Sequence, residues 1–97
     1  MSANSEALAL ITTIIVTNPD NTTEEYTASD LPINVQVGDY VIVYTSGYLS
    51  SPPLVSDKAY IGNQTVPSTT GSSVYPGSTR MYRFIMPCSD VAIVGDR

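Results

Sequence analysis

The hydroxyl and carboxyl side chains are the groups that could perform chemistry in this chain of 97 residues, because it contains no histidine. A serine or threonine nucleophile needs a neighbouring base, and a hydrolytic carboxylate pair needs two carboxyl groups that face each other. Glu24 and Glu25 are neighbours on a predicted strand, so their side chains point to opposite faces and cannot form such a pair. The sequence therefore predicts a protein that is not an enzyme and has no catalytic residue.

The segment Asn18-Pro19-Asp20-Asn21-Thr22 gathers several oxygen donors, which makes it the best metal candidate. Calcium takes about six to eight oxygen ligands, and nothing in the sequence shows that Asp30 or Asp90 converges on this segment. The missing histidines also remove the usual zinc ligand. We interpret the segment as a turn, in which proline fixes φ and Asn and Asp bond locally. We expect no metal and no cofactor.

Cys88 is the only cysteine, so the chain cannot form an internal disulfide. Without a histidine or a cationic pocket beside it, we predict that Cys88 is a small buried hydrophobe. Seven Tyr and one Phe could instead form a sugar-binding platform, since Tyr40 and Tyr44 share a strand face and Tyr48 follows. The absence of Trp favours core or interface roles for these rings.

The charge of the chain limits its partners. The net charge is −5 and the four cations form no cluster, which argues against nucleic acid and against an anionic membrane surface. The apolar run Ala7–Val16 is too short to span a bilayer and has no basic residue before it, so we expect neither membrane insertion nor a classical export signal. Only 13% of the residues are charged, which suits a surface that neighbours cover.

Short strands must position these residues. Alternating apolar residues and turn signals predict about seven of them in one domain, residues 1–97, with residues 1–7 as an N-terminal arm. The predicted strands are Leu8–Thr17, Thr22–Ala28, Ile33–Val37, Asp39–Ser46, Lys58–Ile61, Thr79–Met86 and Asp90–Val94. A helical turn at Ser5–Leu10 is the alternative at the N-terminus. This pattern predicts an all-β chain folded as an antiparallel β-sandwich.

The polar segment 63–78 is predicted to be a long loop rich in Ser, Thr, Gly and Pro. Loops of this length are often functional, so we expect it to contact another molecule; the alternative is that it packs on its own domain. A second, proline-stiffened loop begins at Gly47. The candidate interaction residues on these loops are Tyr48, Pro52, Pro53, Val66, Pro67, Val74, Tyr75 and Pro76.

The closing segment places a proline corner between two apolar strands, with the pattern Tyr82-x-Phe84-x-Met86-Pro87-x-Ser89-Asp90-Val91-x-Ile93. Together with Val37–Val43 and Ser46-Gly47-Tyr48, it resembles the divergent internalin B-repeats, which are immunoglobulin-like modules of bacterial surface proteins. The resemblance covers about Gly38 to Val94 and implies an immunoglobulin-like sandwich. The chain departs from the family at Cys88, where Ala is usual, and in lacking the recurrent Trp.

Similar immunoglobulin-like modules occur in bacteriophage virion proteins, and an unsecreted chain that starts at its own Met is closer to that use. We therefore expect a structural virion protein made in the host cytoplasm, either a capsid decoration or a head or tail accessory protein. Its partners would be neighbouring subunits, such as the major capsid protein or further copies of itself. The alternatives are an adhesion or carbohydrate-binding module at the bacterial cell surface, and an accessory domain of an enzyme.

Overall fold

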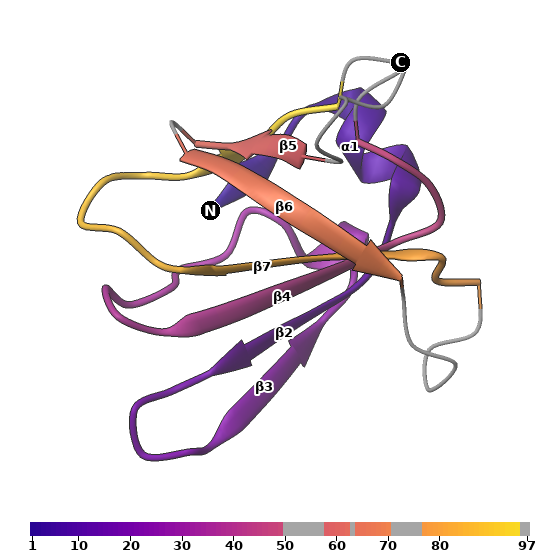
Figure 1. Ribbon diagram of the computed structural model, residues 1–97. Helices are drawn as coiled ribbons and strands as arrows, with labels where there is room; N and C mark the ends of the chain where they lie inside the picture. The colour runs from indigo at the N-terminus through magenta and orange to yellow at the C-terminus, as the bar shows by residue number, and fades with distance from the viewer. Residues whose placement is uncertain (50–57, 63, 71–76, 96–97) are drawn as a thin grey trace.

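The computed structural model describes residues 1–49, 58–62, 64–70 and 77–95 (Figure 1). Strand is the main secondary structure of these residues and helix is rare, so the predicted all-β class is confirmed. The elements in chain order are β1 (Ser2–Ala3), α1 (Ser5–Leu10), β2 (Ile11–Thr17), β3 (Thr23–Tyr26), the 3₁₀ helix η1 (Ala28–Asp30), β4 (Tyr40–Thr45), β5 (Lys58–Ile61), β6 (Gln64–Thr70), β7 (Arg80–Ile85) and β8 (Ala92–Ile93).

The described strands form one curled, mixed sheet in the order β1-β8-β5-β6-β7-β4-β2-β3 (Figure 1). Strand β6 turns the sheet, because its first half pairs with β5 and its second half pairs with β7. The β1–β8 pair is parallel and the other pairs are antiparallel. The sheet is therefore mixed, whereas the sequence predicted a purely antiparallel arrangement. Strand β4 is an interior strand, paired with β2 on one side and β7 on the other.

The core fills the inside of the curl. Alternate residues of the strands point inward, as the period of a β-strand requires. The inward side chains include Ile14, Val16, Val41, Val43, Ala59, Ile61, Val66, Tyr82, Phe84 and Ile93, all of them buried. Full burial of one such aliphatic side chain contributes about 1.5–3 kcal/mol, so this alternation stabilises the curled sheet.

The N-terminal segment differs from the expected strand Leu8–Thr17. Residues Ser5–Leu10 form α1, and the strand starts only at Ile11. The side chain of Asn4 caps the helix by accepting a hydrogen bond from Ala7 N–H at 2.9 Å. Glu, Ala and Leu favour a helix up to Leu10, and the β-branched run that follows favours a strand. Because Met1 and Ala7 are buried, residues 1–7 are part of the folded body.

Two further segments were predicted wrongly. Residues Ile33–Val37 are not a strand, because the backbone of Ile33 bonds to Met1 instead of joining a sheet ladder. In contrast, Gln64–Thr70 is strand β6 and not part of a loop. Its alternation is hard to see in the sequence, because one of its two inward residues is the polar Ser68, buried beside Val66.

The proline corner lies between β7 and β8, and it carries the chain across the curl from the β4 side to the β5 side (Figure 1). Two backbone hydrogen bonds of 2.9 Å hold its start, Gly38 N–H to Met86 O and Met86 N–H to Asp39 O. Cys88 is exposed at this corner, so the prediction of a buried cysteine is wrong. The corner bulges outward after the buried Met86, and Val91 is the next side chain to reach the core.

No helix in the described part of the chain is long and apolar enough to cross a membrane.

Candidate interaction surfaces

The candidate interaction residues fall into three groups. Pro52, Pro53, Val74, Tyr75 and Pro76 lie outside the described residues. Val66 is only 3% exposed and belongs to the core, so it offers no surface to a partner. Pro67 is exposed on β6, opposite Lys58 of β5, and Tyr48 is half-buried.

Tyr48 has a structural role in the described residues. The guanidinium carbon of Arg80 lies 4.7 Å from the centre of its ring, which is a cation–π contact. Arg80 also donates a hydrogen bond of 2.8 Å from Nη2 to Ser68 Oγ. The next residue, Leu49, donates its N–H to the buried hydroxyl of Tyr82 at 3.0 Å. These contacts fasten the chain after β4 to β6 and β7, and they cover one face of the Tyr48 ring.

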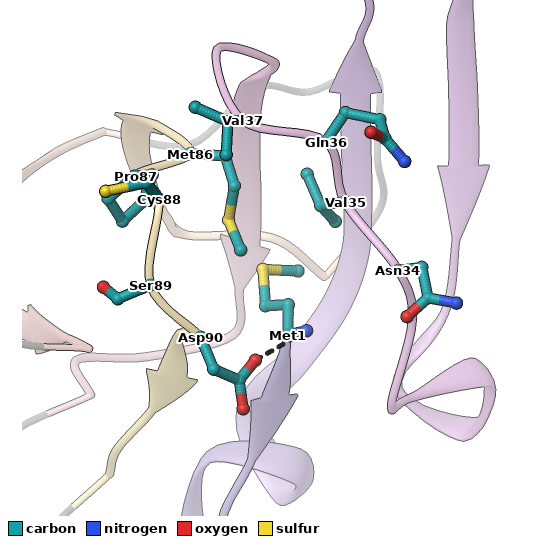
Figure 2. A pocket seen from close by; sticks show the side chains of 10 residues that line it. All are labelled: Met1, Asn34, Val35, Gln36, Val37, Met86, Pro87, Cys88, Ser89 and Asp90. Atoms are coloured by element: carbon teal, nitrogen blue, oxygen red, sulfur yellow. Dashed lines mark ion pairs between the residues drawn. The ribbon is translucent and has the colours of Figure 1, made fainter.

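A pocket of about 360 Å³ lies at the proline corner, and Figure 2 shows its lining side chains. Met1 and Met86 point toward each other across it, and Cys88 points away from them. The Met1 ammonium donates a 2.7 Å hydrogen bond to Ile33 O and lies 3.4 Å from Asp90 Oδ1. The cation and the carboxylate of the pocket thus face each other. The lining residues are Met1, Asn34, Val35, Gln36, Val37, Met86, Pro87, Cys88, Ser89 and Asp90.

Large apolar side chains are exposed at one end of β4 and β7. Tyr40 and Ile85 are directly opposite each other in the ladder and share the outer face of the sheet, with exposed fractions of 37% and 62%. Val37 is 63% exposed at the turn that leads into β4. We call Val37, Tyr40 and Ile85 the apolar patch. The sequence showed that both faces of β4 are apolar, but the pairing with Ile85 comes only from the register.

The β2–β3 hairpin carries a second distinct surface, and its turn is built as the sequence predicted. Asn18 N–H bonds to Thr22 O at 2.8 Å and Asn21 N–H bonds to Asn18 O at 2.9 Å. Asn21 adopts a φ of 68°, a left-handed conformation that Asn tolerates better than most residues. The carboxylate of Asp20 accepts hydrogen bonds from Thr22 N–H and from the Thr22 hydroxyl. The oxygens of this segment thus serve the turn.

Hydrogen bonds stabilise the charged form of two carboxylates in this hairpin, Asp20 and Glu24. Glu24 accepts hydrogen bonds from the Tyr26 hydroxyl at 2.6 Å and from Asn18 Nδ2 at 3.2 Å, and these bonds lower the pKa of Glu24. The two bonds from Thr22 lower the pKa of Asp20 in the same way. The hydrogen bond to Glu24 raises the pKa of Tyr26, because it stabilises the protonated phenol. The hairpin is therefore anionic at neutral pH.

Charge is divided unequally along the chain. Seven of the nine acidic residues, and none of the four Lys and Arg residues, fall in residues 1–57. The hairpin and η1 contribute Asp20, Glu24, Glu25 and Asp30 to this acidic half. Such an asymmetry creates a local field that attracts cations and repels anions.

No group of three or more His, Cys, Asp and Glu side chains among the described residues could hold a metal ion. Comparisons of the chain with protein-family models, with curated proteins and with solved structures found no match.

Proposed function

We propose that this chain is a non-enzymatic structural protein that binds neighbouring protein subunits of a larger assembly. The observation that carries the proposal is the apolar patch. Tyr40 and Ile85 are exposed side by side, and Val37 is exposed at the turn before β4, on a chain in which only 13% of the residues are charged. Contiguous exposed apolar surface commonly marks a site of protein association, because its burial is favourable.

The patch supports adhesion through a rigid frame. Tyr40 and Ile85 lie on paired strands, so the ordering of the backbone is complete before a partner arrives. Tyrosine buries a large area with few rotatable bonds, which keeps the entropic cost of binding low. The acidic half of the chain would align a partner that carries a basic surface beside its own apolar patch.

The finer proposal is an immunoglobulin-like module of a bacteriophage virion, where it would decorate the capsid or join a head or tail structure. The resemblance of the closing motif to the internalin B-repeats supports this proposal. Five apolar side chains of that motif are buried in the core, which also supports the proposal: Tyr82, Phe84, Met86, Val91 and Ile93. The partner would then be a neighbouring subunit such as the major capsid protein.

Co-sedimentation with the purified particles of the phage that encodes the chain tests this proposal. We expect the protein to pellet with particles, and Tyr40→Ser combined with Ile85→Thr to reduce the bound fraction at least about tenfold, a loss of about 1.4 kcal/mol. Tyr60→Ser is the matched control, because Tyr60 is also an exposed tyrosine, 57% exposed against 37% for Tyr40, but lies on β5. Absence from particles at every concentration would contradict the proposal. Binding to immobilised glycans that is lost with Tyr40→Ala would favour the carbohydrate-binding alternative.

A further inference from the structure

Strand β3 forms an open edge of the described sheet. It pairs with β2 on one side, it is last in the strand order, and no hydrogen bond from another described strand reaches its other side (Figure 1). Residues Thr23–Glu25 are exposed. An edge strand presents unpaired backbone donors and acceptors, which makes it a template for a further strand.

The hydrogen-bonding pattern between β2 and β3 shows which backbone groups of β3 face away from the sheet. Asn18 N–H bonds to Thr22 O, so the backbone carbonyl of Thr22 points toward β2. Hydrogen-bonded residues alternate along an antiparallel pair, and therefore the backbone N–H and C=O groups of Glu24 and Tyr26 also point toward β2. The N–H and C=O groups of Thr23 and Glu25 point away from the sheet. The open edge thus offers two donors and two acceptors in the spacing that an added strand needs.

The charge of the edge selects its occupant. Glu24 and Glu25 place one carboxylate on each face of the strand, and Asp20 adds another at the turn. Hydrogen bonds fix the carboxylates of Glu24 and Asp20 in place. A second copy of β3 would bring like charges opposite each other, which is unfavourable in a strand pair. A strand with Lys or Arg side chains would meet opposite charges on both faces.

We propose that β3 binds an extended, cationic segment of a partner protein as an added β-strand. This proposal rests on the proposed role in subunit binding and names the chemistry of the partner. The backbone groups of Thr23 and Glu25 supply the pairing, and the carboxylates on both faces supply the selection. The apolar patch is a different contact: Tyr40 and Ile85 lie on the interior strands β4 and β7, and β2 separates Tyr40 from Thr23 in the sheet.

A peptide of alternating lysine and threonine, about eight residues long, is the probe, because that length exceeds the ~14 Å of β3. We expect it to shift the backbone amide resonances of Thr23 and Glu25 in an NMR titration. The same peptide with N-methyl groups on the amides that would face β3 keeps its charge but cannot pair. We expect its affinity to fall at least about tenfold, since pairing requires those N–H groups.

Two variants of Thr23 test the edge from the protein side. Thr23→Pro removes an outward N–H and no ladder bond, which an edge strand tolerates, and it leaves every carboxylate in place. Thr23→Val is the matched control, because it keeps the N–H and the β-branched shape. We expect Thr23→Pro to weaken peptide binding at least about tenfold and Thr23→Val to leave it within about twofold. Thermal unfolding of both variants verifies the fold.

The contribution of charge to peptide binding is tested separately. Glu25→Gln should weaken binding of the lysine peptide several-fold and flatten its dependence on salt, because screening acts on exposed charges. A matched peptide of alternating glutamate and threonine should not bind. Equal binding of the lysine peptide by wild type and Thr23→Pro would overturn strand addition, since only charge attraction would remain. Self-association of the chain that Thr23→Pro abolishes would also overturn it, in favour of a second copy.

The two proposals can fail separately. If the protein binds particles through the apolar patch but the lysine peptide does not shift β3, the strand proposal fails and the structural role stands. If the peptide binds β3 but the protein never binds particles, the role in that assembly fails and the edge remains a site for cationic segments.

Discussion

The two edges of the sheet are managed in opposite ways. Strand β1 has only two residues, α1 follows it directly, and the backbone of Ile33 bonds to Met1 at its start. Strand β3 is longer, exposed, and has no neighbour on its outer side among the described strands. The β1 edge is covered by other parts of the chain, whereas the β3 edge is protected only by its charged side chains.

The difference shows how an acidic edge strand can avoid pairing with copies of itself and still pair with a cationic strand. Lysine, proline and bulges commonly protect edges from pairing with any strand. Glutamate on both faces of β3 protects it from its own copies but leaves cationic strands free to approach. The two edges should therefore differ in how much they depend on packing, hydrogen bonds and charge.

The largest effect is expected beside the closed edge. Ile93 of β8 pairs with Ala3 of β1 and is fully buried. Ile93→Ala should lower the free energy of unfolding by about 2–5 kcal/mol, because it leaves a cavity in the core. Thr23→Ala on the open edge should change it by less than about 0.5 kcal/mol. Chemical denaturation measures both. Equal losses at the two edges would contradict the comparison.

A smaller effect is expected from the hydrogen bonds that tie the N-terminus to the C-terminal segment. Asn4 caps α1, accepts from Gly95 N–H at 3.0 Å and donates to Gly95 O at 2.9 Å. Asn4→Ala should lower the free energy of unfolding by about 2–3 kcal/mol, since it removes a cap and leaves part-buried groups of Gly95 without their partner. Asn18→Ala in the exposed turn should cost less than about 1 kcal/mol. A larger loss of unfolding free energy from Asn18→Ala than from Asn4→Ala would contradict this prediction.

The charges of the open edge predict a pH dependence. The pKa values of Asp20 and Glu24 are lowered from the ordinary 3.8 and 4.5, so the folded state binds fewer protons there than the unfolded state. Their contribution to stability is present above those ordinary values and is lost as the pH falls below them. Glu24→Gln should make unfolding less sensitive to pH between about 5 and 3. Denaturant titrations at several pH values measure this slope, and an unchanged slope would show that the bonds to Glu24 add nothing.

The smallest effect is expected at the corner. Cys88 is exposed, so Cys88→Ser should change the free energy of unfolding by less than about 0.5 kcal/mol. The thiol should also react with a thiol reagent in the native protein at a rate close to that of the unfolded chain. Protection of the thiol until global unfolding would restore the buried position that the sequence suggested.

Much of the sheet could be predicted because its signals are local. The strands at Tyr40–Thr45 and Arg80–Ile85 repeat every second residue, and the turn at Asn18–Thr22 has the residues that such turns need. The helix at Ser5–Leu10 was only the alternative, because six residues carry little periodic signal. Strand β6 was missed because the buried Ser68 breaks its apolar pattern.

The candidate surfaces could be predicted less well, because they depend on which strands meet. The sequence singled out Tyr48, but its contact with Arg80 joins residues 32 positions apart and appears only in the fold. Glu24 and Glu25 were recognised as neighbours on opposite faces of a strand. That this strand is an edge follows from the order of all eight described strands.

The sequence by itself determined the all-β class, the hairpin turn, the acidic balance and the proline corner, since each depends on residues that are close along the chain. Only the tertiary structure decided that the sheet curls through β6, that Ile85 meets Tyr40, and that β1 is closed while β3 is open. These features depend on the pairing of distant segments, and that pairing is fixed by the joint burial of side chains from every strand in one core.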